Sequence, residues 1–198
     1  DALVSYDLFT LKIIAITTPK VIDEDASIIK YLLDRGIYSI HLRKPDSDIN
    51  DCRNILTELT SWERAQIVIH DYPELYYEFS LKGIHINRNV ITLPNDYNGL
   101  KTRSCHTLKE IIKYKNDYDY LFLSPIFDSI SKIGYKSNFN DQDLQKASAD
   151  GIIDRKVIAL GGITFDKISY LKKLNFGGVA MIGAIYKLDA ITKITDTY

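Results

Sequence analysis

The sequence predicts an α/β protein built as a single small (β/α)8 barrel, the TIM-barrel fold. Three observations lead to this fold class. Short apolar segments recur eight times along the chain, they show little polar alternation, and amphipathic segments separate most of them. Continuously apolar strands between helices are typical of a parallel sheet that helices cover. The 198 residues suit one domain, residues 1–198, although such barrels usually have about 250 residues.

The eight expected strands follow one another in the order β, α, β along the chain. They are residues 11–19, 38–43, 65–71, 83–87, 101–106, 119–127, 156–162 and 176–186. An open doubly wound sheet is the alternative. Its usual cue is a Gly-x-Gly-x-x-Gly turn after the first strand, but the chain reads "TTPKV" there.

Helices are expected wherever apolar residues recur at helical spacing after a capping residue. The first is capped by Asp23 or Asp25 and ends before Gly36, and the second begins at Asp46, Ser47 or Asp48. The others are expected at residues 73 to about 81, 107–115, 141–149 and 165–174, and in the last dozen residues. Residues 88–99 contain proline, asparagine and glycine and predict a loop. The helix after the fourth strand is therefore reduced or missing.

Composition excludes several function classes. The formal net charge is −1 and no long run of Lys or Arg occurs, which argues against a nucleic-acid or membrane-surface role. No apolar run reaches the ~18 residues of a membrane span, and no basic segment precedes an apolar stretch as in a signal peptide. We expect a cytoplasmic protein whose two cysteines, Cys52 and Cys105, are reduced thiols.

The carboxyl ends of the strands build the active site in barrels of this class. The polar, histidine and glycine residues that fall at the expected strand ends are Thr17, Thr18, His41, Arg43, His70, Asp71, His85, Asn87, Ser104, His106, Ser124, Gly161, Gly162 and Gly183. All four histidines of the chain are among them.

The stretch "KVIALGGITF" places two adjacent glycines at the end of the seventh strand. Loops after the seventh and eighth strands often hold phosphate through backbone N–H groups, and glycine leaves that backbone accessible. Gly161, Gly162 and Gly183 therefore predict a phosphate cradle. The alternative is a tight turn that only requires positive φ.

Four further features have both a functional and a structural interpretation. Arg43 can bind a phosphate or carboxylate in bidentate fashion, or form a surface ion pair. Asp71 can be a Mg²⁺ ligand or a helix N-cap. The segment "SISK", residues 129–132, can be a lid or a solvated loop. Ser104 and His106 alternate along a strand and could both point inward, although a structural histidine is the more common case.

Eight stretches, taken together and in order, resemble the thiamine phosphate synthase and thiazole tautomerase superfamily. They are "HLRK", "IVIHD", "GIHI", "SCHTLKE", "DYLFLSPIF", "SK", "VIALGGIT" and "GVAMIGAI". The resemblance extends from Ile14 to about Tyr186. It implies a small (β/α)8 barrel and, in the synthase branch, coupling of hydroxymethylpyrimidine diphosphate to thiazole phosphate with Mg²⁺-assisted release of pyrophosphate. Its partners are small phosphorylated substrates, and a homo-oligomer is left open.

The resemblance also implies roles for individual residues. Arg43, Asp71 and Lys132 are the implied catalytic residues, with Asp71 as the metal ligand. The implied substrate-binding residues are His41 against the pyrimidine, His70, His106, the serines Ser104, Ser129 and Ser131, and Gly161, Gly162, Ile182 and Gly183 around the thiazole phosphate.

The chain departs from the synthase pattern at several positions. A pyrophosphate-binding lysine expected at position 45 is Pro45, with Lys44 as the candidate to replace it, and a second metal-binding aspartate is Val90. His41 and the "RSCH" stretch lean toward the tautomerase branch, yet that branch uses a catalytic histidine where this chain has Pro125. The alternatives to a synthase are a tautomerase-like isomerase and a non-catalytic binder of thiazole phosphate or thiamine phosphate.

Overall fold

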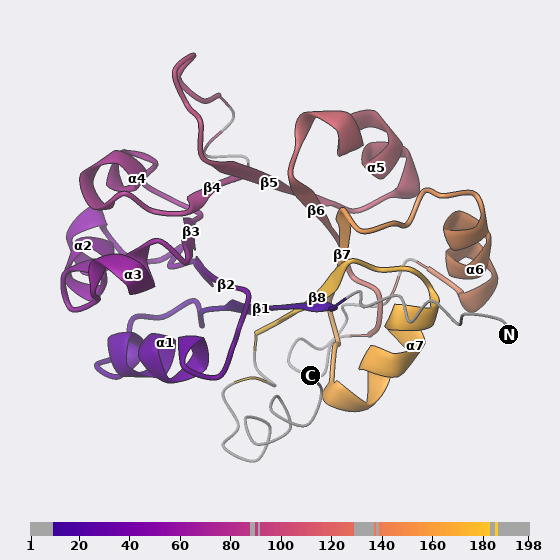
Figure 1. Cartoon of the computed structure of the whole chain (residues 1–198), viewed down its shortest axis with the longest axis horizontal. Coiled ribbons are helices and arrows are strands. Elements are labelled where there is room, and N and C mark those ends of the chain that lie inside the picture. The colour runs from indigo at the N-terminus through magenta and orange to yellow at the C-terminus, as the bar shows by residue number, and fades with distance from the viewer. Residues whose placement is uncertain are drawn as a thin grey trace, which may run out of the picture.

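The computed structural model describes residues 10–87, 90, 92–128, 137, 139–182 and 185. Within these residues eight parallel strands form a closed barrel in the order of the sequence, and helices surround it (Figure 1). The eighth strand pairs with the first, with Ile14 opposite Ala180, and this pairing closes the barrel. The predicted (β/α)8 fold class is confirmed, and the open doubly wound sheet is excluded.

Each strand lies inside its expected range or within one residue of it. The strands are β1 (Lys12–Ile16), β2 (Ser39–Leu42), β3 (Ile67–Ile69), β4 (Gly83–Ile86), β5 (Leu100–Cys105), β6 (Tyr120–Leu123), β7 (Val157–Leu160) and β8 (Gly178–Met181). Most of these strands are short and buried, because a parallel barrel covers both faces of each strand. The fifth, LKTRSC, is polar and is fully buried only at Thr102 and Cys105.

The helices also follow the expected order. They are α1 (Asp25–Leu33), α2 (Ile49–Thr57), α3 (Ser61–Arg64), α4 (Glu74–Phe79), α5 (Leu108–Tyr114), α6 (Asp141–Ala149) and α7 (Ile168–Lys173), with 3-10 turns at Lys115–Asp117 and Phe165–Lys167. The described residues between β4 and β5 form no helix, and this connection projects from the barrel in Figure 1. The expected terminal helix lies outside the described residues.

The helix starts show which capping predictions were right. Asp48 caps α2, and its carboxylate accepts from the backbone N–H groups of Asn50 and Asp51 in a capping box. Asp25 does not cap α1, because Glu24 holds the N-cap position. The short helix α3 was not expected, although Thr60 and Glu63 form a capping box at its start.

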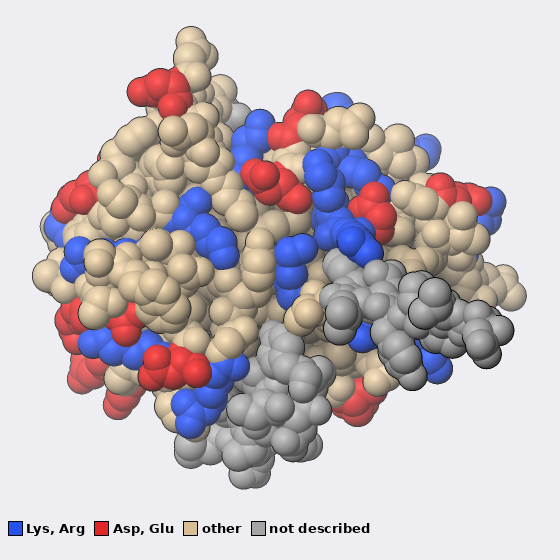
Figure 2. All heavy atoms as spheres, viewed as in Figure 1, with Lys and Arg blue, Asp and Glu red and all other residues tan. Residues whose placement is uncertain are grey.

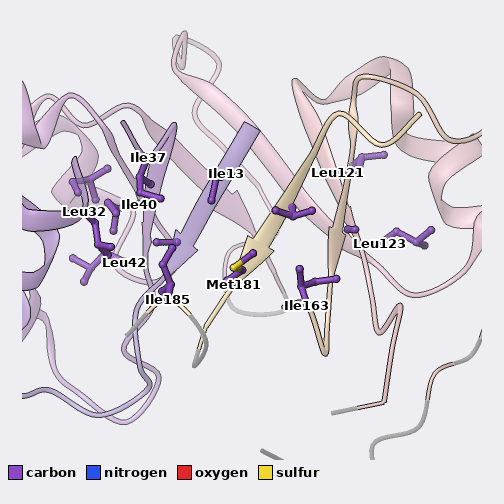
Figure 3. Packing of buried hydrophobic residues seen from close by; sticks show 14 of the residues in the cluster. Ile13, Leu32, Ile37, Ile40, Leu42, Leu121, Leu123, Ile163, Met181 and Ile185 are labelled. Atoms are coloured by element: carbon purple, nitrogen blue, oxygen red, sulfur yellow. The ribbon is translucent and has the colours of Figure 1, made fainter. Parts of the chain in front are cut away.

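The main hydrophobic core lies between the barrel and the helices. The outward-facing residues of each strand pack there against apolar helix residues. Figure 3 shows part of this core, with Leu32 of α1 beside Ile40 and Leu42 of β2. The described residues contain no helix long and apolar enough to cross a membrane. Acidic and basic side chains are interspersed over the face seen in Figure 2.

The barrel interior divides into two halves. Inward-facing residues of β1, β6, β7 and β8 form the apolar half, which comprises Ile14, Ile16, Tyr120, Phe122, Ile158, Leu160 and Ala180. Polar residues on β2, on β4 and β5 and at the end of β3 form the polar half, which comprises Ser39, His41, His70, His85, Thr102 and Ser104. Polar side chains in such an interior must bond to one another, because buried polar groups without partners are costly.

Candidate active site

Three histidines of the polar half lie against one another inside the barrel. His41 Nδ1 is 2.8 Å from His70 Nε2, and His41 Nε2 is 2.6 Å from the hydroxyl of Tyr120. His85 Nδ1 is 2.7 Å from Thr102 Oγ1, and its Nε2 is 3.0 Å from Ser104 Oγ. One ring nitrogen from each of the three imidazoles lies within 4.8 Å of the others. The sequence placed these histidines near strand ends, and the barrel brings them together.

Burial keeps this cluster uncharged. Burial, followed by the charges of Arg43 and Arg103, lowers the pKa of His85 from its usual 6.5 to about 3. Burial also holds the pKa values of His41 and His70 well below 6.5, and His85 contributes to both shifts. Neutral imidazoles have a free lone pair on one ring nitrogen, so the cluster can accept hydrogen bonds or bind a metal ion.

His41 has a different place from the one that the resemblance implied. Its side chain is fully buried, and both ring nitrogens are engaged by Tyr120 and His70. A direct contact with a substrate ring is therefore not open to it in this arrangement. His70 lies one step nearer the mouth, directly after β3, with 5% of its surface exposed. His41 can position His70, and His70 can meet a ligand.

Ser104 and His106, which could both have pointed inward, do not form a pair. Ser104 points into the barrel and contacts His85, whereas His106 lies beyond the end of β5 on an exposed turn. His106 Nδ1 is 3.0 Å from the carbonyl oxygen of Ser124. The two residues face different surroundings, so they are not a nucleophile and its base.

Arg43 and Asp71 follow the ends of β2 and β3 and are both half-buried. The backbone N–H of Arg43 donates to Thr17 Oγ1, and the hydroxyl of Thr17 donates to the carbonyl oxygen of Arg43, which ties the ends of β1 and β2 together. The charge of Arg43 acts on both His70 and His85, so the guanidinium lies on the side of the polar half.

Lys44 cannot replace the lysine that the family pattern expects at position 45. Its side chain is completely buried, and its Nζ lies 2.7 Å from the carboxylate of Asp25 and donates to the carbonyl oxygen of Lys20. Asp25 also accepts from the backbone N–H of Ile22. This ammonium belongs to a buried ion pair between the segment after β2 and the start of α1, and it offers no charge to an anion at the mouth.

The second metal-ligand position of the family is apolar and buried. Val90 is 6% exposed, and its backbone N–H donates to Asn87 Oδ1, while Asn87 Nδ2 donates to the carbonyl oxygen of His70. Of the two metal-ligand positions of the family, Asp71 after β3 is the one that keeps its carboxylate. A single carboxylate fits Mg²⁺, which usually takes one or two carboxylates and completes its shell with water and substrate phosphates.

The glycine turn, residues Gly161 and Gly162, follows β7 in a left-handed backbone conformation with φ of 98° and 62°. A Cβ at Gly162 would lie 2.4 Å from the carbonyl oxygen of Asp128, and one at Gly161 would lie 2.8 Å from the Cα of Pro125. Positive φ and the close approach of residues 125–128 together require glycine here. The tight-turn interpretation accounts for both glycines, and phosphate binding stays a prediction.

Several predicted site residues lie outside the described residues, namely Ser129, Ser131, Lys132 and Gly183. Ile182 follows β8 and is 40% exposed, so its side chain is accessible at this end of the barrel. Sequence reasoning missed Tyr120 and Thr102, which hold His41 and His85. Each is a polar residue at an inward-facing position of its strand, which is the signal that could have found them.

The fold and these residues define the class of protein: a (β/α)8-barrel protein whose polar and charged side chains gather at the carboxyl ends of the strands. The sequence model of a family described as thiamine monophosphate synthase matches residues 13–185. The chain belongs to this family.

Individual relatives agree with this assignment. The thiamine-phosphate synthase of Clostridioides difficile (strain 630) is 28% identical over 171 residues, which are 81% of this chain and 80% of that protein. The crystal structure of thiamine phosphate pyrophosphorylase from Bacteroides thetaiotaomicron is 33% identical, with a TM-score of 0.83 over 94% of this chain and 95% of that one. The Pyrococcus furiosus thiamine phosphate pyrophosphorylase has a TM-score of 0.74 at 18% identity and shows the shared fold.

Proposed function

We propose that this protein is a transferase of thiamine biosynthesis that joins hydroxymethylpyrimidine diphosphate to thiazole phosphate and releases pyrophosphate. The observation that carries the proposal is the position of Arg43, Asp71 and the glycine turn. In a closed parallel barrel, the ends of β2, β3 and β7 open onto the same mouth. Two phosphorylated substrates can therefore meet there, one on the side of β2 and β3 and the other beside β7.

Arg43 is proposed to bind the diphosphate of the pyrimidine substrate. Charge builds up on the pyrophosphate as its bond to the pyrimidine methylene carbon breaks, and a guanidinium aimed at that charge stabilises the transition state more than the ground state. Lys44 is committed to Asp25. The positive charge offered to the leaving group therefore depends on Arg43 and on the family position Lys132.

Asp71 is proposed to hold Mg²⁺ through one carboxylate oxygen. When bound, the ion supplies positive charge to the leaving diphosphate. Because Val90 offers no oxygen, the diphosphate and water have to complete the coordination shell. We therefore expect Mg²⁺ to bind much more tightly together with the diphosphate than alone.

The glycine turn is proposed to bind the thiazole phosphate through backbone N–H groups. The left-handed conformation of Gly161 and Gly162 turns successive peptide groups in a tight loop, a geometry that suits anions. The isomerase alternative lacks its proton carrier, because Pro125 stands at the family's histidine position and packs against Gly161. The synthase is therefore the function that these residues support best.

A paired-substrate assay tests the proposal. The chain is incubated with both substrates, with each one alone, and with and without Mg²⁺, and pyrophosphate is measured. We expect release only with both substrates and Mg²⁺. A folded chain that releases none at any Mg²⁺ concentration contradicts the proposal. If thiazole phosphate still raises the melting temperature of that chain, the protein is a binder of the same ligand.

A further inference from the structure

The polar half of the barrel contains a histidine cluster to which the resemblance assigns at most substrate contacts and no metal. It consists of His41, His70 and His85, three of the four histidines in the chain, and all three are buried. One ring nitrogen from each lies within 4.8 Å of the other two. The cluster contains no carboxylate and no thiolate.

We propose that His41, His70 and His85 form a binding site for a single transition-metal ion such as Zn²⁺, with three imidazole ligands and a fourth position open toward the mouth. Imidazole nitrogen suits Zn²⁺, Cu²⁺ and Ni²⁺, whereas Mg²⁺ and Ca²⁺ require oxygen ligands. Three protein ligands with one open position is the arrangement of catalytic zinc sites, in contrast to closed structural sites. The site does not depend on the proposed reaction.

The groups around the cluster support this assignment. Histidines that bind metals usually donate the N–H of their other ring nitrogen to a protein oxygen, which fixes the tautomer. His41 Nε2 has the Tyr120 hydroxyl at 2.6 Å, and His85 Nδ1 has Thr102 Oγ1 at 2.7 Å. With these N–H groups held, the lone pairs of His41 Nδ1 and His85 Nε2 accept from His70 Nε2 and Ser104 Oγ, and an ion would replace those two contacts. His70 Nε2 then carries the proton of its bond to His41, so it binds an ion only after that proton moves to its other ring nitrogen.

Metal binding requires a small rearrangement of the cluster. His41 Nδ1 and His70 Nε2 are 2.8 Å apart, whereas two ligands of a tetrahedral zinc ion at ~2.0–2.1 Å are separated by roughly 3.3 Å. The rings of His70 and His85 are stacked, with centroids 4.1 Å apart and an interplanar angle of 12°. One of these two rings therefore turns out of the stack when both bind the same ion.

The open fourth coordination position would allow the cluster to hold a cation although two arginines lie near it. Arg43 and Arg103 both act electrostatically on His85, and this opposes a bare dication. An anionic fourth ligand, either hydroxide or a substrate oxygen, offsets that repulsion. His70 is 5% exposed and lies directly after β3, so this position faces the mouth where such a ligand enters.

Titration of the tag-free, chelator-treated chain with Co²⁺, followed by competition with Zn²⁺, tests the proposal. We expect one ion per chain and the intense visible absorption of four-coordinate cobalt. His41→Gln, His70→Gln and His85→Gln should each weaken binding by at least ~100-fold, because changes outside the ligand set alone usually cost 10–100-fold. His106→Gln is the matched control, since His106 lies on an exposed turn away from the cluster, and it should bind as the unmodified chain does.

A second pair of variants keeps the test valid if a histidine variant does not fold. Tyr120→Phe and Thr102→Val leave all three imidazoles in place and remove only the oxygen that holds their N–H groups, so they should weaken binding ~10–100-fold. Circular dichroism establishes that each variant is folded. The proposal is overturned if the folded chain binds neither ion at one equivalent, or if the folded cluster variants bind as tightly as His106→Gln.

Discussion

Two sides of the candidate site differ in what they are built from. The polar half of the barrel interior is built from side chains, whereas the turn after β7 is built from backbone. On β2 to β5 the site is made of imidazoles, hydroxyls and a guanidinium whose partners come from different strands. After β7 it is made of Gly161 and Gly162, whose shape is fixed by positive φ and by residues 125–128 packed against them. Side chains can be exchanged without altering the barrel, but the backbone turn cannot change without moving its neighbours.

This difference explains where the chain departs from the family pattern. Pro45, Val90 and His41, where the chain departs from the synthase pattern, all belong to the side that is built from side chains. The glycine turn keeps the family's form. Under the proposed function, the residues of β2 to β5 set the chemistry, and the turn after β7 is the proposed anchor for a phosphate.

The largest expected effect concerns the buried ion pair between Lys44 and Asp25. Lys44→Ala leaves the buried carboxylate of Asp25 without its cation, and breaking such a pair usually costs about 3–5 kcal/mol. The free energy of unfolding, measured by urea denaturation, should fall by that amount. Lys146→Ala, which removes an exposed pair with Asp150, is the control and should leave the midpoint nearly unchanged. Equal midpoints in the two variants would show that Lys44 is not held as described.

The glycine turn provides the next effect. Gly162→Ala forces a side chain into a left-handed conformation and against the Asp128 carbonyl, so we expect a loss of about 1–2 kcal/mol from conformation and a further ~1–3 kcal/mol from overpacking. Gly151→Ala is the matched control, because Gly151 has a φ of 70° and a Cβ added there would meet no atom within 4 Å. The difference between the two variants in the free energy of unfolding gives the part of the loss that is due to the contact of the new Cβ with the Asp128 carbonyl. If both variants lose the same stability, residues 125–128 do not constrain the turn.

The smallest effect, within the window of pH ~6.5 to 5 where it can be measured cleanly, is a pH dependence of the metal-free chain. The folded pKa of His85 is about 3 and its unfolded pKa is near 6.5, so the unfolded chain takes up a proton that the folded chain refuses. The stability linked to His85 is complete above pH ~6.5 and is lost at ~1.4 kcal/mol per pH unit as the pH falls toward 3.

His85→Gln should lower the slope of the free energy of unfolding against pH by that amount. The measurement belongs between pH ~6.5 and 5, where carboxylates with pKa values near 4 contribute little. Chelator is present throughout. An unchanged slope in the variant would mean that His85 is already charged or exposed in the folded chain.

The sequence sufficed for the barrel because most strands are short apolar runs and several helices begin at a capping residue. Asp48 shows this at α2, where the predicted cap is confirmed. Asp25 shows what the sequence cannot reveal. A capping aspartate and an aspartate of a buried ion pair look alike until Lys44, which follows β2, is placed beside α1. Chain order cannot reveal such pairs between distant segments.

The site was predictable only in part for the same reason. The strand-end rule found the three clustered histidines, yet it could not show that His41 faces Tyr120 across the barrel. It also grouped Ser104 with His106, although one lies inside β5 and the other beyond its end. Residues 104 and 106 would share one face if the strand continued, but β5 ends at Cys105 and His106 lies on the turn that follows. The exact strand end comes only from the structure.

The most direct test of the two-sided site is the Michaelis constant of each substrate in two variants, measured with Mg²⁺ below the unfolding temperature. Arg43→Ala should raise the KM of hydroxymethylpyrimidine diphosphate ~10–100-fold, the loss of a charge-assisted hydrogen bond, and leave that of thiazole phosphate nearly unchanged. Gly162→Ala should raise the KM of thiazole phosphate and leave that of hydroxymethylpyrimidine diphosphate nearly unchanged. If both variants raise the KM of the same substrate, the two phosphorylated groups do not bind on opposite sides of the mouth, and the account is contradicted.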